Sequence, residues 1–214
     1  MQSLFVQSFK DNRYFFIPLL LWIIAGALLQ LIFTPTELFM PANQFFSPLL
    51  DYLNTSFSFF GRGDTIAVTL VSFMLIPGLR NRRYITSSLI FGVMIPVTIY
   101  FSKLFFHTPR PLTVYGTDKV HTVQWLDNLF MNSFPSGHTI GAFGFFMLLS
   151  LFLPLNYKRW SVLFFGLALA CAYSRLYLGQ HFFGDVYAGS IIGSFLTWII
   201  YVIIHSYDKK TTDA

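Results

Sequence analysis

The sequence predicts an all-α membrane protein, because it combines six apolar segments of helical length with few charged residues and many aromatic ones. Hydrophobic residues make up 55% of the 214 positions and charged residues 11%, whereas a soluble domain carries about 25% charged residues. Aromatic side chains fill 20% of the positions, more than a soluble core of this size buries but readily solvated by a bilayer. The composition therefore excludes a disordered, collagen-like or ordinary cytosolic protein, and the single cysteine, Cys171, excludes an intramolecular disulfide or a cysteine-based zinc site.

The apolar segments predict six transmembrane helices. A helix that rises 1.5 Å per residue needs about 20 residues to cross about 30 Å of hydrocarbon. Four of the charge-free runs approach or reach this length, while the second and fifth must extend back to Gly61 and past Arg175, respectively. We expect one integral-membrane domain over residues 1–214, with spans at about 14–33, 61–79, 84–103, 136–155, 160–178 and 182–204.

An amphipathic surface helix is predicted between the first two spans. Its apolar residues recur at helical spacing, while polar residues fall between them; the apolar positions are Phe45, Phe46, Leu49, Leu50 and Leu53. A short helix packed within a loop is the alternative interpretation.

The distribution of basic residues predicts the orientation of the chain. With six spans both termini lie on one face, and that face collects nine Lys and Arg residues against five on the other. The positive-inside rule then places the termini in the cytoplasm. The five residues on the outer face are Arg62, Lys103, Arg110, Lys119 and Arg175.

Most of the polar residues that are unusual in so apolar a chain fall in three short segments at the outer ends of the predicted spans. They are residues 103–111, 133–138 and 174–185. Charges at a membrane boundary are costly, so their convergence from four helices favours a functional site over coincidence. By contrast, we interpret His107, His121 and His205 as interfacial residues.

The three segments carry the groups that bind phosphate. Arg110 and Arg175 can each present a planar fork to two phosphate oxygens, and Lys103 adds a point charge. A helix that begins near Ser136 and Gly137 would offer unpaired N–H groups to the same anion. We therefore expect a phosphate site at this face.

Two histidines and a carboxylate complete the predicted chemistry. His181 and Asp185 are four residues apart, so on a helix they share a face, and the carboxylate can orient the imidazole for nucleophilic attack. His138 lies on another helix, where it can protonate a leaving oxygen. Because Asp185 is the only acid near these segments, no carboxylate cluster is expected to hold Mg²⁺, and we expect neither a metal nor a cofactor.

At these residues the sequence resembles the type-2 phosphatidic-acid phosphatases, whose active site is shared with the vanadium haloperoxidases. The signature is filled at every position and reads Lys103-x6-Arg110-Pro111, then residues 133–138 as Ser-Phe-Pro-Ser-Gly-His, then Ser174-Arg175-x5-His181-x3-Asp185. The resemblance implies hydrolysis of a phosphate ester without metal, through a phosphohistidine. It implies that His181 is the nucleophile, His138 the acid and Asp185 the orienting group, and that phosphate is bound by Lys103, Arg110, Ser136, Gly137 and Arg175.

The leading interpretation is therefore a lipid phosphatase of a bacterial inner membrane with its site on the periplasmic or extracellular face. The expected partners are membrane lipids and a lipid phosphate, with no nucleic acid: undecaprenyl pyrophosphate, phosphatidylglycerophosphate, phosphatidic acid and lipid A phosphate all remain open. A lipid phosphotransferase that uses the same phosphohistidine is an alternative, whereas the soluble haloperoxidases are disfavoured by the apolar composition. A non-enzymatic transporter would need charges at mid-span, and the mid-span positions are almost wholly apolar.

Overall fold

The computed structural model describes residues 2–76 and 81–212, and the regular structure in these ranges is helical apart from one isolated β-bridge between Pro109 and Met131. The elements in chain order are α1 (Gln2–Asp11), α2 (Arg13–Ile32), α3 (Pro35–Gln44), α4 (Pro48–Phe59), α5 (Gly63–Leu75), α6 (Arg82–Phe106), α7 (Pro111–Tyr115), α8 (Gly137–Phe152), the 3₁₀ helix η1 (Leu155–Trp160), α9 (Ser161–Tyr177) and α10 (Phe183–Thr212).

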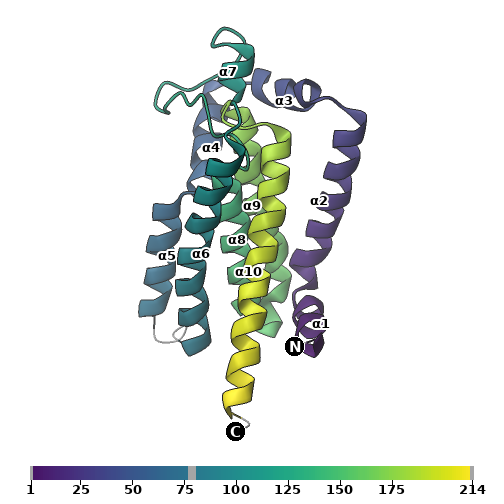
Figure 1. The fold of residues 1–214 in the computed structure, drawn as a ribbon, viewed down its shortest axis with the longest axis vertical. Coiled ribbons are helices and arrows are strands. Elements are labelled where there is room, and N and C mark those ends of the chain that lie inside the picture. The colour runs from purple at the N-terminus through teal and green to yellow at the C-terminus, as the bar shows by residue number, and fades with distance from the viewer. Residues whose placement is uncertain (1, 77–80, 213–214) are drawn as a thin grey trace.

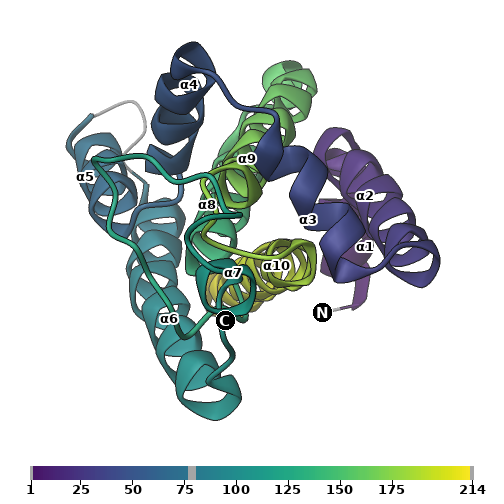
Figure 2. The same cartoon turned by 90° about the horizontal axis from the view of Figure 1, so that it is seen from above.

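The long helices run side by side along the longest axis of the molecule (Figure 1). Helices α3 and α7 lie at one end of this bundle, and α1 and the last turns of α10 lie at the other. Seen from above, α8 occupies the middle, with α9, α10 and α6 around it (Figure 2). Helix α8 is accordingly buried along nearly its whole length.

Glycines allow α8 and α10 to pack closely. A Cβ atom at Gly189 would lie 2.9 Å from the carbonyl oxygen of Ser136, and one at Gly193 would overlap the carbonyl oxygen of Ile140. On the α8 side, a Cβ at Gly144 would lie 2.9 Å from the hydroxyl of Thr197. Small residues of this kind let two helix backbones approach within a membrane. This contact holds the start of α8 beside the start of α10.

A helix occurs at each of the six predicted span positions, and the predicted all-α class is confirmed. Four helical segments in the described ranges are long and apolar enough to cross a membrane: 13–32, 82–106, 155–177 and 183–207. Helices α5 and α8 are apolar but shorter, with 13 and 16 residues, and the predicted end of the second span at 79 lies outside the described residues. The chain is an integral membrane protein, while the count of six spans stays a prediction.

A helix begins three residues after the predicted start of the surface helix at Phe45, and a further helix, α3, which was not predicted, precedes it. Helix α3 ends at Gln44 and α4 begins at Pro48, so Phe45 and Phe46 lie in the connection, with 75% and 56% of their surface exposed. The residue before a proline avoids the helical conformation, and Ser47 is extended, with φ −157° and ψ 160°. Ser47 then caps α4 by accepting a hydrogen bond from Leu50 N–H.

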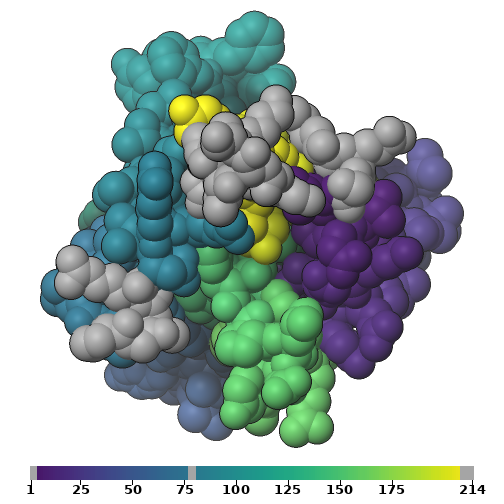
Figure 3. All heavy atoms as spheres, turned by 90° about the horizontal axis from the view of Figure 1, so that it is seen from below, coloured from purple at the N-terminus to yellow at the C-terminus, as the bar shows by residue number. Residues whose placement is uncertain are grey.

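The opposite end of the bundle contains a buried lysine. Figure 3 shows this face, where the N-terminal helices, the segment after α8 and the start of α6 meet. Lys158 is 5% exposed, and its Nζ donates to Asn12 Oδ1 at 2.6 Å and to the carbonyl oxygens of Ser150 and Leu151 at 2.8 and 3.1 Å. It therefore binds the last carbonyls of α8, where a cation is favourable.

Candidate active site

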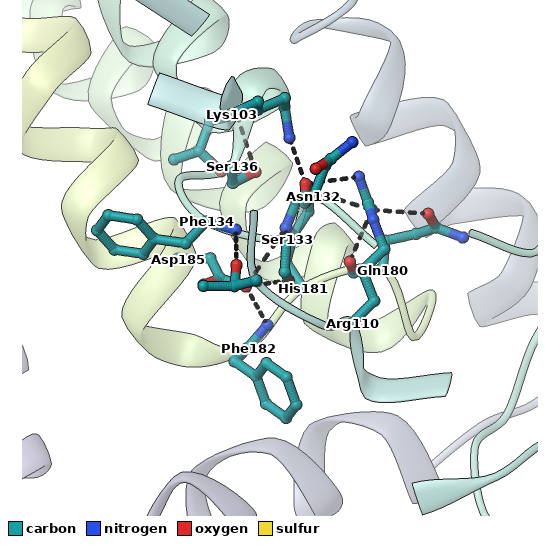
Figure 4. Close-up of polar contacts among 12 residues, drawn as sticks. Lys103, Arg110, Asn132, Ser133, Phe134, Ser136, Gln180, His181, Phe182 and Asp185 are labelled. Carbon is teal, nitrogen blue, oxygen red and sulfur yellow. Dashed lines mark hydrogen bonds and ion pairs between the residues drawn. The ribbon is translucent and has the colours of Figure 1, made fainter. Parts of the chain in front are cut away.

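The three predicted segments meet at the α3–α7 end of the bundle. Each candidate residue lies at or beside a helix end, and Figure 4 shows most of them within one polar cluster. The first segment supplies Lys103, in the last turn of α6, and Arg110, at the N-cap of α7. The second supplies Ser136, the N-cap of α8, and Gly137 and His138, its first two residues. The third supplies Arg175, in the last turn of α9, His181, in the α9–α10 connection, and Asp185, in the first turn of α10.

His181 and Asp185 are in contact, but they do not share a helix face. His181 precedes α10, and its Nδ1 lies 3.4 Å from Asp185 Oδ2. The same carboxylate oxygen accepts hydrogen bonds from Ser133 Oγ at 2.5 Å and from Phe182 N–H at 2.9 Å. Ser133 Oγ also lies 3.4 Å from His181 Nδ1. The contacts on Nδ1 leave Nε2 as the nitrogen that faces the cations.

A tight helix end sets the position of His181. The N–H groups of Gln180 and His181 both donate to the carbonyl oxygen of Arg175, at 3.0 and 3.2 Å. Gly179 adopts φ +68°, and a Cβ atom there would also lie 2.6 Å from a methyl group of Val120. Glycine is thus required at this turn for both conformation and space.

Arg110 is held by carbonyl groups of the site. Its Nε donates to Met131 O at 2.8 Å and its Nη2 to Asn132 O at 3.3 Å. Its Nη1 donates to the backbone oxygen of Gln180 at 2.8 Å and to its Oε1 at 3.2 Å, and lies 3.5 Å from His181 Nε2. A guanidinium has five N–H groups, so these contacts leave one for a ligand in place of the free fork expected from sequence. Burial lowers the pKa of Arg110, and the charge of Asp185 opposes this shift.

Arg175 is buried, with 5% of its surface exposed. Its Nη1 donates to the hydroxyl of Ser58 on α4. Within the described ranges its Nε has no hydrogen-bond partner. A buried donor without a partner is costly, which is consistent with a position where a ligand supplies the acceptor.

Lys103 and Arg110 are joined through one backbone group. The carbonyl oxygen of Asn132 accepts from Lys103 Nζ at 2.5 Å and from Arg110 Nη2 at 3.3 Å. Asn132 adopts φ +61°, a conformation that asparagine tolerates better than most residues. The connection before α8 therefore fixes two of the cations relative to each other.

Burial keeps His181 neutral. Its side chain is 2% exposed, and burial, followed by the charges of Arg110, Arg175 and Lys103, lowers the pKa of His181 well below its ordinary value. An unprotonated imidazole has a free lone pair at neutral pH. His181 is thus in the state that a nucleophile requires.

The start of α8 is tied to the start of α10. Ser136 N–H donates to the carbonyl oxygen of Asp185 at 3.1 Å, while its Oγ accepts from Thr139 N–H and Oγ1 at 3.4 and 2.9 Å. Ser136 is fully buried, and its Oγ is the acceptor in both side-chain contacts, so its own O–H is left to donate. Gly137 and His138 follow at the first helical positions, where N–H groups have no intrahelical acceptor.

Two cavities meet at the cluster. The apolar cavity, of about 590 Å³, lies between α5, α6 and α8 and reaches Lys103, Arg110, Gly137, His138, Arg175 and His181. A smaller cavity, of about 260 Å³, has a mixed lining of Thr55, Ser58, Arg62, Asp127, His138, Arg175 and Gln180 with Phe59, Leu126 and Leu129. His138 and Arg175 border both cavities. Among the residues that the structure describes, there is no group of three or more His, Cys, Asp or Glu side chains that could hold a metal ion.

Four residues of the cluster received no role from the sequence. Ser133 and Gln180 lie inside the recognised segments, but the sequence does not show which groups they contact. Asn132 acts through a backbone oxygen, and Ser58 comes from α4, outside the recognised segments. Contacts of these two kinds leave no pattern in a single sequence.

Comparisons with known proteins agree with this geometry. The profile of the PAP2 superfamily matches residues 83–208. A lipid A 4'-phosphatase of Bacteroides thetaiotaomicron is 32% identical over 186 residues, which cover 82% of this chain and 79% of that protein.

Two solved structures share the fold. The crystal structure of Aquifex aeolicus LpxE superposes with a TM-score of 0.62 at 31% identity, covering 78% of this chain and 93% of that one. A PAP2-type phosphatidylglycerolphosphate phosphatase of Bacillus subtilis superposes with a TM-score of 0.64 at 20% identity, covering 94% and 97%. The predicted family resemblance and hydrolase class are thereby confirmed, and the chain belongs to the PAP2 superfamily.

Proposed function

We propose that this protein hydrolyses a lipid phosphate through a phosphohistidine formed on His181. The observation that carries this proposal is the position of His181, whose Nδ1 faces Asp185 and Ser133 while its Nε2 lies 3.5 Å from Arg110. A neutral imidazole oriented in this way directs one nitrogen at a phosphate held by cations.

In the proposed reaction, His181 Nε2 attacks the phosphorus atom as the bond from phosphorus to the leaving oxygen breaks. His138 gives a proton to that oxygen, and the lipid leaves as an alcohol. Water, giving its proton to His138, then attacks the phosphohistidine and releases inorganic phosphate. Lys103, Arg110 and Arg175, with the N–H groups at Gly137 and His138, stabilise the charge on the phosphoryl oxygens.

Ser136 has two roles in this proposal. Its hydroxyl accepts from Thr139 and its N–H donates to Asp185 O, which orients the start of α8, and its own O–H is left to donate to the phosphate. The N–H groups that follow it remain directed toward the phosphate. No step in this scheme uses a metal ion.

Lipid A phosphate is the first substrate to test, because one relative bears the name lipid A 4'-phosphatase. The apolar cavity extends from the phosphate-binding residues between α5 and α6, and we propose that it holds an acyl chain of the substrate. The predicted orientation puts this end of the bundle outside a bacterial inner membrane, with the termini in the cytoplasm.

The test is phosphate release by purified protein, in EDTA, from lipid A phosphate, phosphatidic acid, phosphatidylglycerophosphate and undecaprenyl pyrophosphate. We expect His181→Ala to abolish release, while His205→Ala, at the opposite end of α10, retains it. With an aryl phosphate, His138→Ala should accumulate an acid-labile, base-stable phosphoenzyme, because a good leaving group needs no acid and the second step lacks its base.

Residual turnover in His181→Ala comparable to the wild type would refute the phosphohistidine mechanism. Dependence on added Mg²⁺ would refute a metal-free reaction. Transfer of the phosphoryl group to an added lipid alcohol, in place of free phosphate, would identify a phosphotransferase.

A further inference from the structure

The turn between α4 and α5 lies against the first turn of α8, although none of its residues belongs to the family signature. The two helices follow one another along the bundle (Figure 1), and residues 60–62 join them. A Cβ atom at Gly61 would overlap the carbonyl oxygen of His138 and would lie 2.8 Å from Cys171 Sγ on α9. Glycine is therefore needed here for space, and it sets how closely the turn approaches the proposed acid.

This contact is close on both sides and is confined to the turn. On α8, a Cβ atom at Gly141 would lie 3.0 Å from the carbonyl oxygen of Gly61. At Gly63, the first residue of α5, a Cβ atom would meet no atom within 4 Å. The turn and the start of α8 thus pack backbone against backbone, and a shift of one is transmitted to the other.

The same turn also holds one of the cations. Arg175 Nη1 donates to the hydroxyl of Ser58, which is buried. The carbonyl oxygen of Ser58 accepts from Gly61 N–H at 3.1 Å. One short stretch of backbone therefore contacts the proposed acid through Gly61 and a proposed phosphate-binding arginine through Ser58.

The position of the His138 imidazole depends on its backbone. Among the residues that the structure describes, none forms a hydrogen bond with this ring, and the Sγ of Cys171 lies 3.9 Å from the backbone oxygen of His138. We infer that Gly61 is a positioning residue for the general acid, because its contact with that backbone sets where the imidazole meets the leaving oxygen. This inference rests on the proposed function, in which His138 protonates that oxygen.

A displaced acid has a kinetic effect that a displaced cation does not share. Protonation matters most when the leaving oxygen is strongly basic, whereas a good leaving group departs without it. A shift of His138 should therefore slow cleavage of an alkyl phosphate and spare a nitrophenyl phosphate. A shift of Arg175 should slow both, since both substrates present the same phosphoryl group.

The experiment compares kcat/KM for a long-chain alkyl phosphate and for a nitrophenyl phosphate that carries a chain of the same length. In Gly61→Ala we expect kcat/KM to fall about tenfold or more for the alkyl ester and to change less than about twofold for the nitrophenyl ester. With the nitrophenyl ester, kcat and KM should fall together and phosphoenzyme should accumulate, because the attack of water on the phosphohistidine also uses His138.

Two further variants show whether the effect belongs to the acid. Ser58→Ala removes the contact with Arg175 and should lower kcat/KM for both esters by a similar factor of about ten. Gly166→Ala adds the same methyl group on α9, where a Cβ atom meets no atom within 4 Å, and is the matched control with both rates unchanged.

Gly141→Ala presses on the same contact from α8 and decides the question if Gly61→Ala does not fold; we expect the same preference with a smaller loss. An equal loss on both esters, or no loss on either, would overturn the positioning role. His138→Ala distinguishes this failure from that of the proposed function. If His138→Ala slows the alkyl ester selectively while the glycine variants do not, only the inference about Gly61 fails, whereas an equal loss in His138→Ala would refute the proposed acid itself.

Discussion

His181 is neutral although three cations surround it, and its burial and the positions of those cations account for this protonation state. In the proposed mechanism three positive charges attract the phosphate, and the same charges, together with burial, lower the pKa of His181, the proposed nucleophile. Arg110 has the closest contact, with its Nη1 3.5 Å from His181 Nε2. One residue thereby serves both the binding of the anion and the protonation state of the nucleophile.

This coupling predicts a pH effect. His181 must be unprotonated to attack, so the acid limb of kcat/KM in the wild type should lie well below pH 6.5. Arg110→Gln removes a positive charge, which raises the pKa of His181 and should move the acid limb to higher pH by about one unit. Profiles measured with one substrate over the same pH range provide the check.

Arg110→Lys is the control, because it keeps the charge while losing the carbonyl contacts. Its rate should fall, but its acid limb should stay near the wild-type position. An unmoved limb in Arg110→Gln would mean that Arg110 does not set the protonation state of His181.

At this scale the sequence predicted the identity of the titrating groups better than their contacts. Residue type and spacing pointed to His181 and Asp185, because the family signature fixes both. The signature does not state that Ser133 binds the carboxylate or that carbonyl groups occupy most of the Arg110 guanidinium. Those contacts depend on the path of the connecting segments, which no periodicity encodes.

At the scale of elements, the contact between α8 and α10 positions the acid and the nucleophile relative to each other. The Ser136 N–H to Asp185 O hydrogen bond crosses this contact, and Gly189 and Gly193 let the helices approach. Hydropathy predicted the start of each helix to within one residue, while α10 continues to Thr212, eight residues beyond the predicted end at 204. The surface helix was predicted to begin at Phe45, because apolar spacing continues through Phe45 and Phe46, whereas α4 begins at Pro48; α3 was not predicted.

The close contact predicts that Gly193→Ala destabilises the protein. Its Cβ would overlap the carbonyl oxygen of Ile140, and overpacking of this kind costs about 1–3 kcal/mol. We expect a lower midpoint of thermal unfolding in detergent and reduced turnover, since the two helix starts move apart. Gly166→Ala on α9 meets no atom within 4 Å and serves as the control, with an unchanged or slightly higher midpoint. Equal shifts in the two variants would argue against the role of the glycine contact.

At the scale of the whole molecule, the two ends of the bundle differ in character. Polar groups gather at the α3–α7 end, where the connections on either side of α7 and the α9–α10 connection meet, and the apolar cavity leads from them between α5, α6 and α8. The sequence predicted that the chemistry lies at one face, because charges are excluded from the spans. It did not predict the cavity, because the space arises from how α5 and α6 pack.

Filling this space tests how the substrate is held. Gly92 lies on α6 in the wall of the apolar cavity, and a Cβ there meets no atom within 4 Å, so Gly92→Phe introduces a ring into open space. The acyl chain enters from a bilayer or detergent phase that is as apolar as the cavity, so the ring removes packing contacts with the chain and not a transfer from water, and kcat/KM should fall about threefold or more. We expect that loss for a long-chain lipid phosphate and a change of less than about twofold for a short soluble phosphate ester, because the ester needs only the phosphate-binding residues.

Gly166→Phe places the same ring on α9, away from this cavity, and should leave the ratio of the two rates unchanged. If Gly92→Phe slows both substrates equally, or neither, the acyl chain lies elsewhere and the apolar cavity has no part in binding it.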